Sequence, residues 1–440
     1  MKLNVCTAGF ARLDITPPLG TYIGGYFSAR YTKGVLDPIY VRALAFGQGD
    51  KSAVVLVVDQ CGFRKDAADV WPDLIAERLE LPREAVFVCC THSHTTPEVG
   101  TPRADAQYDA WLLRRLGDAA QMALDDRKTV IDVRGAQQDT QMTFSRRYRM
   151  KDGAEMGNPP AKTWEDIDKI AGPLGKVDQT IRLIRVLRQD GPELLIVSFQ
   201  SHPDCIGGEY ISADFPGAVC DRLEEVAENA CGIFLNGAQG NMVINDRMKP
   251  LPACGIKDYQ AAMDYGIQLA DKAMELYDSA ASTNMEGLFF GRVIVCAKTK
   301  RGKLPIDYCE DIVKRYMAGG LAAIDPNPKI ATPIVAEAQM VWNLEQLKQD
   351  VIDLPVSVVV FCGVALAGIP GEPFSEIGRS IRENSPFPVT CTCCLTNGSY
   401  GYFANLTAIE EGGYDTVNTK LVPGTAEQLA DAAIRLLNDI

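Results

Sequence analysis

The sequence predicts an α/β protein whose core is a layered, mixed β-sheet flanked by helices. Runs of apolar, mostly β-branched residues recur along the chain, and segments with apolar residues at helical spacing lie between them. This alternation of strands and helices is typical of layered α/β architectures. Apolar residues make up 47% of the chain and charged residues 23%, which is the balance of an ordinary globular protein.

The individual elements are predicted from local patterns, in chain order. Strands are expected where an apolar run ends in polar or turn-forming residues, at 53–58, 85–90, 194–199, 232–236, 287–297, 356–361 and 364–369. Helices are expected where apolar residues recur at helical spacing, at 66–79, 109–125, 216–229, 258–279, 306–317 and 425–438. The last two strands are expected to form a hairpin, because their apolar stretch is shorter than the ~20 residues of a membrane span. Asp214 is placed to cap the helix that begins at Pro216.

The predicted organisation is one domain that covers 1–440. No repeat, low-complexity tract or Pro/Ser-rich linker interrupts the chain. The segment 298–353 is more polar and more helical than its surroundings. We expect this segment to be a helical insertion that covers a site.

Charge and cysteine usage limit the expected partners and location. The net charge is −13 and no basic cluster is long enough to follow a phosphate backbone, so we expect no nucleic-acid partner. The first residues do not read as a signal peptide and no apolar stretch has the length of a span, so we predict a cytoplasmic protein without stable membrane insertion. The 14 cysteines are expected to be reduced, and the group Cys391, Cys393 and Cys394 lacks the second pair of a zinc ribbon. The oligomeric state is not readable from the sequence.

Histidine is scarce, and its placement is the strongest functional signal. The chain has three histidines, and His92 and His94 follow the expected strand 85–90 at a spacing of two. If the backbone stays extended, this spacing puts both rings on one face. His202 follows the expected strand 194–199 in the same way. Each position taken alone is more often that of a structural residue than of a metal ligand or catalytic group.

A carboxylate takes the corresponding position after a third strand. Glu372 follows the expected strand 364–369, where it could instead favour a helix N-terminus through the helix dipole. Because sites in α/β folds gather at the carboxyl ends of strands, we expect the three strand ends to converge. Two or three imidazoles and one carboxylate suit zinc in a catalytic site, which keeps a position open for water.

Several short segments extend this pattern along nearly the whole chain. They are DITPP from Asp14, GGY from Gly24, THSHTTPEVG from Thr91, SRRY from Ser145, SHP from Ser201, ISADFPG from Ile211, PGE from Pro370 and the tyrosine-rich stretch 396–414. In type and order these segments resemble the neutral/alkaline non-lysosomal ceramidases and their bacterial relatives. The resemblance implies a fold like that of the ceramidase catalytic domain.

The resemblance also implies the residues of the site. It implies a zinc ion bound by a set of four ligands, namely His92, His202, Glu372 and Tyr402. Tyr400 is an alternative to Tyr402, because the local match is loose. His94, Arg146 and Tyr414 are implied around the substrate, and Tyr414 lies twelve residues after Tyr402 as the family pattern requires.

The chain departs from the family at the motif for amide hydrolysis. The family motif GDVSPN contains an essential serine, whereas the aligned segment 240–245 reads GNMVIN, with Val243 at the serine position. The chain also lacks the length for the family's immunoglobulin-like second domain. We therefore expect a small soluble substrate in place of ceramide.

The predicted activity is that of a zinc-dependent hydrolase that cleaves an amide or related bond without the serine. Zinc lowers the pKa of a bound water to about 7, and the hydroxide attacks the carbonyl carbon. His94 accepts or returns the proton, and Arg146 and Tyr414 donate to the developing oxyanion.

Other interpretations stay open. The same scaffold could carry a metal-dependent, glycoside-cleaving or lyase-type enzyme for a carbohydrate-like substrate, or a non-catalytic metal binder. Asp59 is either a partner that orients a ligand imidazole or a strand-end turn residue. Cys205 could be a nucleophile, although family relatives carry a small hydroxyl residue there. Arg146 and Arg147 could select a carboxylate.

Overall fold

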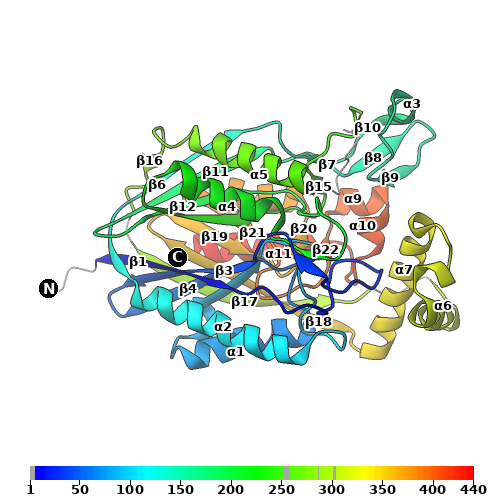
Figure 1. Cartoon of the computed structure of the whole chain (residues 1–440), viewed down its shortest axis with the longest axis horizontal. Coiled ribbons are helices and arrows are strands. Elements are labelled where there is room, and N and C mark those ends of the chain that lie inside the picture. Colours follow the sequence, from blue (N-terminus) through cyan, green and yellow to red (C-terminus); the bar gives the residue numbers. More distant parts are fainter. Residues whose placement is uncertain (1–4, 251–257, 286, 301–303) are drawn as a thin grey trace.

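The computed structural model describes residues 5–250, 258–285, 287–300 and 304–440. Two stacked β-sheets lie between outer layers of helices (Figure 1). This arrangement confirms the predicted α/β fold class, with a mixed sheet core and flanking helices.

The larger sheet has nine strands in the order β14-β12-β11-β6-β1-β3-β4-β5, and the short β16 pairs with β6. The strands are β1 (Cys6–Asp14), β3 (Tyr40–Gln48), β4 (Lys51–Val58), β5 (Val86–Cys90), β6 (Lys128–Asp139), β11 (Thr180–Arg188), β12 (Glu193–Phe199), β14 (Ala230–Asn236) and β16 (Ala281–Ser282). The pairs β4–β5 and β12–β14 are parallel, and the other neighbours are antiparallel. The sheet is therefore mixed, as predicted.

The smaller sheet has four strands in the order β17-β18-β19-β21. They are β17 (Leu288–Lys298), β18 (Val351–Phe361), β19 (Val364–Gly368) and β21 (Val389–Cys393). The predicted hairpin is formed by β18 and β19, with Phe361 opposite Val364. One apolar cluster joins the two sheets, with Val55 and Phe87 from the larger sheet and Leu366 from the smaller one. Successive side chains of a strand point to opposite faces, so the outer face of each sheet remains for helices.

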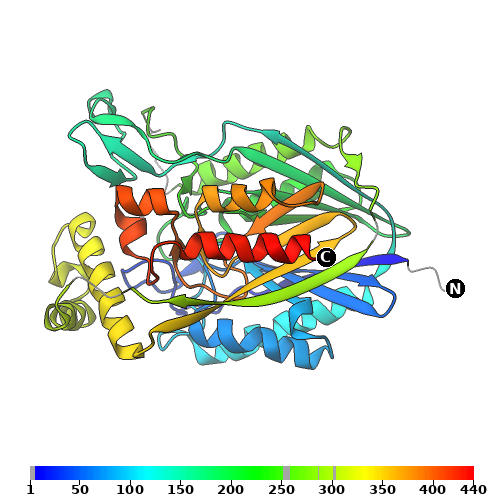
Figure 2. The ribbon, with the colours of Figure 1, turned by 180° about the vertical axis from the view of Figure 1, so that it is seen from behind.

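Three pairs of helices cover these outer faces. Helices α1 (Lys65–Arg78) and α2 (Ala106–Asp125) pack on the β1–β5 part of the larger sheet, and α4 (Asp214–Val226) and α5 (Tyr259–Met274) pack on the β11–β14 part. Helices α8 (Ser375–Glu383) and α11 (Thr425–Asn438) cover the smaller sheet (Figure 2). None of the helices in the described ranges is both long and apolar enough to cross a membrane.

The remaining elements are short or peripheral. The short strands are β2 (Gly34–Val35), β7 (Phe144–Ser145), β8 (Arg147–Met150), β9 (Glu155–Gly157), β10 (Ile170–Pro173), β13 (Tyr210–Ile211), β15 (Met242–Val243), β20 (Glu372–Pro373) and β22 (Tyr402–Phe403). The other helices are α3 (Trp164–Ile167), α6 (Ile306–Gly319), α7 (Pro328–Leu347), α9 (Leu406–Glu411) and α10 (Tyr414–Val417), with 3-10 turns at η1 (Arg83–Ala85) and η2 (Leu321–Ala323).

Helices α6 and α7 form a separate excursion at one end of the molecule (Figure 1). They lie between β17 and β18 and pack on each other through a small apolar cluster of their own. Lys298 of β17 is paired with Val351 of β18, and the Thr299 N–H donates to the Asp350 carbonyl at 3.0 Å. The chain therefore leaves and re-enters the smaller sheet at neighbouring positions.

The predicted role of Asp214 is wrong. Helix α4 begins at Asp214 itself, two residues before Pro216, so Asp214 is not the residue before the helix. Its buried carboxylate accepts hydrogen bonds from the backbone N–H groups of Phe215, Cys205 and Ile206. The side chain thus fixes the loop that follows His202.

Candidate metal centre

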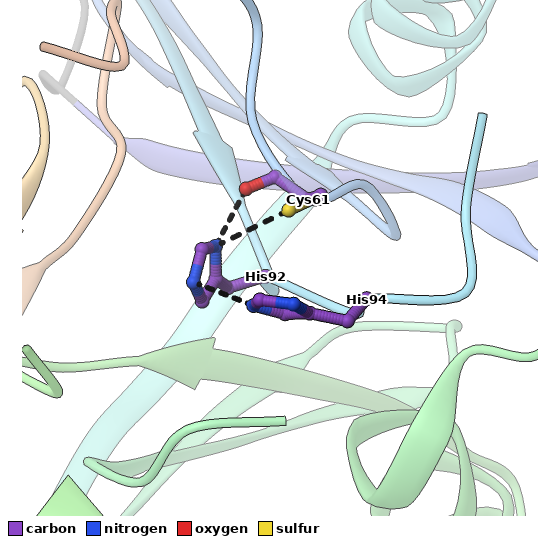
Figure 3. Close-up of side chains that lie close together, drawn as sticks. All are labelled: Cys61, His92 and His94. Atoms are coloured by element: carbon purple, nitrogen blue, oxygen red, sulfur yellow. Dashed lines mark hydrogen bonds between the residues drawn. The ribbon is translucent and has the colours of Figure 1, made fainter. Parts of the chain in front are cut away.

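His92 lies just beyond the end of β5, with its backbone in the left-handed region. Its φ is 77°, so the extended backbone expected through the histidine pair is wrong. The His92 N–H donates to the Gln60 carbonyl at 2.9 Å. Its Nδ1 lies 2.6 Å from the Cys61 carbonyl oxygen, which can only accept, so Nδ1 carries the proton (Figure 3). This bond leaves Nε2 available as a metal ligand.

Two further ligand atoms face Nε2 of His92. His202 Nε2 lies 3.1 Å away, and Glu372 Oε2 lies 3.3 Å from His92 Nε2 and 3.8 Å from His202 Nε2. All three residues are buried, and Oε2 makes no hydrogen bond within the described residues. Zinc bonds of about 2.0–2.1 Å in tetrahedral geometry separate ligand atoms by about 3.3 Å. The donor types and spacings therefore fit a zinc ion.

The charges of this cluster are balanced internally. Burial lowers the pKa of His92, but Glu372 and Cys61 together raise it by a larger amount, so the net pKa is above the ordinary value. The pKa of His202 is lowered by burial and by the nearby His92 and Arg146 charges. Burial raises the pKa of Glu372, yet His92, His202 and Arg146 bring it down to about 2. These directions favour a charged His92 imidazole beside the Glu372 carboxylate and a neutral His202.

The strand ends converge as expected, but they come from two sheets. The histidines follow β5 and β12 of the larger sheet, whereas Glu372 follows β19 of the smaller sheet. Glu372 lies in β20 and is not the N-cap of α8, which is Phe374. The site therefore lies where the two sheets meet.

Asn236, the last residue of β14, joins the two histidine loops. Its Nδ2 donates to the Thr91 carbonyl at 2.9 Å, and its Oδ1 accepts from the Ser201 N–H at 3.4 Å. Asn236 is 3% exposed. One buried amide therefore holds the residues that precede both His92 and His202. Asn236 was not among the predicted site residues, and its signal in the sequence is its place at the end of the expected strand 232–236.

The His94 ring lies next to the rings of His92 and His202. Its Nε2 lies 3.2 Å from His92 Nε2, and its Nδ1 lies 3.8 Å from Asp204 Oδ1. The Tyr26 hydroxyl donates to the same carboxylate. Asp204 was not among the predicted site residues, although its position two residues after His202 marks it as a partner for an imidazole.

Arg146 and Tyr402 are brought together next to Glu372. Arg146 Nη1 donates to the Tyr402 hydroxyl at 3.2 Å, and its Nη2 lies 3.4 Å from Asp415. Burial lowers the pKa of Arg146, but Asp415 and Tyr402 together raise it by a larger amount, so the net pKa is above the ordinary value. Tyr402 in β22 is paired with Glu372 in β20, and burial raises the pKa of its hydroxyl.

The two remaining tyrosines have different surroundings. The Tyr400 hydroxyl donates to Asp69 at 2.8 Å. Tyr414 begins α10, and burial raises its pKa to about 12 even though Arg146 lowers it. Of the two rival ligands, only Tyr402 is paired with Glu372 in a strand ladder.

Asp59 does not orient an imidazole directly, so that prediction is wrong. Its carboxylate pairs with the buried Arg42 at 2.9 Å and accepts from the Tyr40 N–H at 2.9 Å. The Thr91 hydroxyl donates to its other oxygen at 3.4 Å. Asp59 thus holds the residue that precedes His92.

A second group of possible ligands shares His92 with the first. Atoms of Cys61, His92 and His94 lie within 4.8 Å of one another, and Cys61 Sγ is 3.9 Å from His92 Nδ1 (Figure 3). Because that Nδ1 is taken by the Cys61 carbonyl, the two groups are alternatives for one ion. Cys61 was missed, although it follows β4, the parallel neighbour of the strand that precedes His92.

The other cysteines take no part in these groups. The cysteines of the described ranges form no disulfide with one another, and their reduced state stays a prediction. Cys391, Cys393 and Cys394 are buried in and after β21, and neither candidate metal group in the described residues includes them.

Two cavities open at the cluster. The first has a volume of about 310 Å³, and its lining includes His94, His202, Arg146, Cys205, Tyr402 and Tyr414. The second, of about 370 Å³, is lined by His92 and Glu372 on one side and by residues of α6 and α7 on the other. The helices of segment 298–353 thus form one wall of the second cavity.

The comparisons with known proteins agree with this arrangement at the level of the fold. No protein-family model and no curated protein matches the sequence. The crystal structure of neutral ceramidase from Pseudomonas aeruginosa superposes with a TM-score of 0.73 at 15% identity, covering 99% of this chain and 74% of that one. A ceramidase complexed with C2 matches with a TM-score of 0.73 at 13% identity, covering 99% and 75%.

The chain has the neutral ceramidase fold. The predicted resemblance to ceramidases is thereby confirmed for the architecture, although the sequences have diverged widely.

The ceramidase-like fold places Val243 at the first cavity. Val243 lies in β15, which pairs with β7, and its side chain lines the cavity. Val243, which is expected from the sequence to stand at the position of the family serine, therefore presents an apolar isopropyl group to the cavity. The nearby Ser145 is buried, and its hydroxyl is occupied by the Leu174 carbonyl at 2.7 Å.

Proposed function

We propose that this chain is a zinc-dependent hydrolase that cleaves an amide or related bond in a small molecule. The observation that carries the proposal is the convergence of three buried ligand atoms from His92, His202 and Glu372. Tyr402 is the proposed fourth ligand, since its strand pairs with that of Glu372, whereas the Tyr400 hydroxyl bonds Asp69. When bound, zinc acts as a Lewis acid and makes a water nucleophilic at neutral pH.

His94 is the proposed proton carrier. Its ring lies beside the ligand cluster, and its Nδ1 lies 3.8 Å from the Asp204 carboxylate, which can orient the ring. A base that is held by a third group is a common arrangement in hydrolytic sites. Asp204 is itself held by the Tyr26 hydroxyl, which limits how far it can move.

Arg146 and Tyr414 are the proposed donors to the developing oxyanion. Arg146 is fixed between Asp415 and Tyr402, so its guanidinium is oriented before the substrate binds. The raised pKa of about 12 keeps the Tyr414 hydroxyl protonated at neutral pH. Val243 cannot form an acyl intermediate, so the proposed attack is by water directly.

The proposed substrate is small. The cavities of about 310 and 370 Å³ lie at the lower end of ordinary small-molecule sites. Their linings carry several polar and charged side chains. A soluble N-acyl compound fits these features better than a two-chain lipid does.

Metal content tests the proposal first. We expect about one zinc per wild-type chain by inductively coupled plasma mass spectrometry, and none in His202→Ala or Glu372→Ala. Tyr402→Phe is expected to weaken zinc binding, while its matched control Tyr400→Phe keeps it. A wild-type protein that stays metal-free after dialysis against zinc would exclude the zinc site.

Product analysis then tests the reaction. We expect the zinc-loaded protein to release an amine from members of an N-acyl library and His94→Ala to do so much more slowly. Full turnover by His94→Ala would contradict the proton-carrier role. A reducing sugar or an unsaturated product would support the glycoside-cleaving or lyase alternative.

A further inference from the structure

Arg247 is a buried cation that has no anionic partner among the residues the structure describes. Its residue is 6% exposed, and its Nε makes no hydrogen bond within the described residues. The neighbouring Asp246 lies 3.4 Å from Lys249 Nζ, and no ion pair with Arg247 occurs in the described chain. A charge buried without a partner is costly, so a protein retains one where a ligand supplies the missing charge.

The other arginines of this region are already neutralised. Arg146 pairs with Asp415, and Arg147 lies 3.1 Å from Glu411 and 3.4 Å from Glu155. The expectation that Arg146 and Arg147 together select a carboxylate stays a prediction, and both guanidinium groups already face acidic neighbours. Sequence alone did not distinguish these paired arginines from an unpaired one.

Arg247 shares a cavity with the proposed zinc ligands. The first cavity is lined by Arg247 as well as by His202 and Tyr402. Asn158 and Asn245 line it too, and the Oδ1 atom of each is buried without a hydrogen bond in the described residues. Since buried polar atoms normally have partners, this part of the cavity is built for a polar, charged ligand.

We propose that Arg247 binds an anionic group, a carboxylate or a phosphate, of the substrate whose bond is cleaved at the ligand cluster. The position of that bond rests on the proposed function. A guanidinium matches the paired oxygens of either anion, and the amides of Asn158 and Asn245 bind neighbouring polar groups. A net charge of −13 repels anions at long range, so capture depends on this local cation.

Matched pairs of ligands test this assignment by isothermal titration calorimetry on the full chain. One pair is N-acetylglycine and N-acetylglycinamide, and the other is N-acetylglucosamine 6-phosphate and N-acetylglucosamine. A charge-assisted hydrogen-bonded contact predicts that the anionic member binds about 10- to 100-fold more tightly in the wild type. The pair that shows this preference identifies carboxylate or phosphate as the group bound.

Variants locate the preference. Arg247→Met should abolish it, and Arg247→Lys should keep part of it. Arg64→Met is the matched control, because Arg64 is an exposed arginine that lines the second cavity. Replacing an unpaired buried charge by an apolar side chain should not lower the melting temperature, so Arg247→Met is expected to fold.

The possible outcomes separate this proposal from the proposed function. Equal binding of both members of each pair in the wild type, or a preference that survives in Arg247→Met, would falsify the role of Arg247. A preference lost in Arg64→Met instead would place the anion in the second cavity and also refute it. Zinc content is measured on the same samples, so a missing metal would count against the proposed function alone.

Discussion

Replacing Asn236 by alanine should damage both stability and metal binding. The side chain makes one hydrogen bond of 2.9 Å to the Thr91 carbonyl and one of 3.4 Å to the Ser201 N–H, and all three residues are at most 3% exposed. Alanine leaves both backbone groups buried and unpaired, at about 1–3 kcal/mol for each group. Because the second bond is long, we expect a loss of about 2–4 kcal/mol in the free energy of unfolding.

The metal affinity should fall as well. Thr91 and Ser201 directly precede His92 and His202, so the two imidazoles lose their common support in Asn236→Ala. Loss of a group that orients metal ligands typically weakens metal binding about 10- to 100-fold. Urea unfolding of the metal-free protein measures the first effect, and competition for zinc with a chromophoric chelator measures the second.

Asn397 provides a matched control. It is also 3% exposed, and it bonds the Val88 N–H at 3.1 Å and the Ser357 hydroxyl at 3.1 Å. It supports the same strand, β5, without bonding a residue next to a ligand. Asn397→Ala should therefore lose comparable stability and keep its zinc affinity. Equal losses of zinc affinity in both alanine variants, or wild-type affinity in Asn236→Ala, would refute the reasoning.

Three further predictions concern the same site. Cys61→Ala should retain zinc, whereas loss of zinc would assign the ion to the group of Cys61, His92 and His94. Zinc affinity should rise between about pH 6 and 8, by up to about tenfold per pH unit. Burial lowers the pKa of His92, but Glu372 and Cys61 together raise it by more, and zinc must displace the proton that His92 then carries. A pH-independent affinity in the chelator assay would contradict this. Asp204→Asn should lower kcat at least about tenfold with little change in KM, since His94 loses the carboxylate that lies beside its Nδ1; an unchanged kcat would count against it.

The sequence predicts the strands that lead to the site, because these strands are continuous apolar runs. Helix α11 matches the expected range 425–438, and the hairpin of β18 and β19 is found where it was expected. The proximity of His92, His202 and Glu372 follows from their common position after such strands. Local patterns are sufficient here because each buried strand imposes its own composition.

Other features depend on contacts between distant segments, which a single sequence does not show. His92 has a left-handed backbone, and its N–H donates to the carbonyl of Gln60, which follows the neighbouring strand β4. The residues that support the histidines, Asn236 and Cys61, lie 144 and 31 positions from His92 and have ordinary local contexts. The lack of an ion pair at Arg247 within the described residues is a property that exists only in the folded chain.

The excursion of α6 and α7 has a consequence for protein engineering. Its two ends lie at a paired position of adjacent antiparallel strands, with Thr299 bonded to Asp350 at the base. A tight turn of about two residues suffices to join strands in that geometry. The helices that form one wall of the second cavity can therefore be removed or replaced as a unit. Exchanging them between relatives should change substrate choice and leave the stacked sheets and the ligand cluster in place.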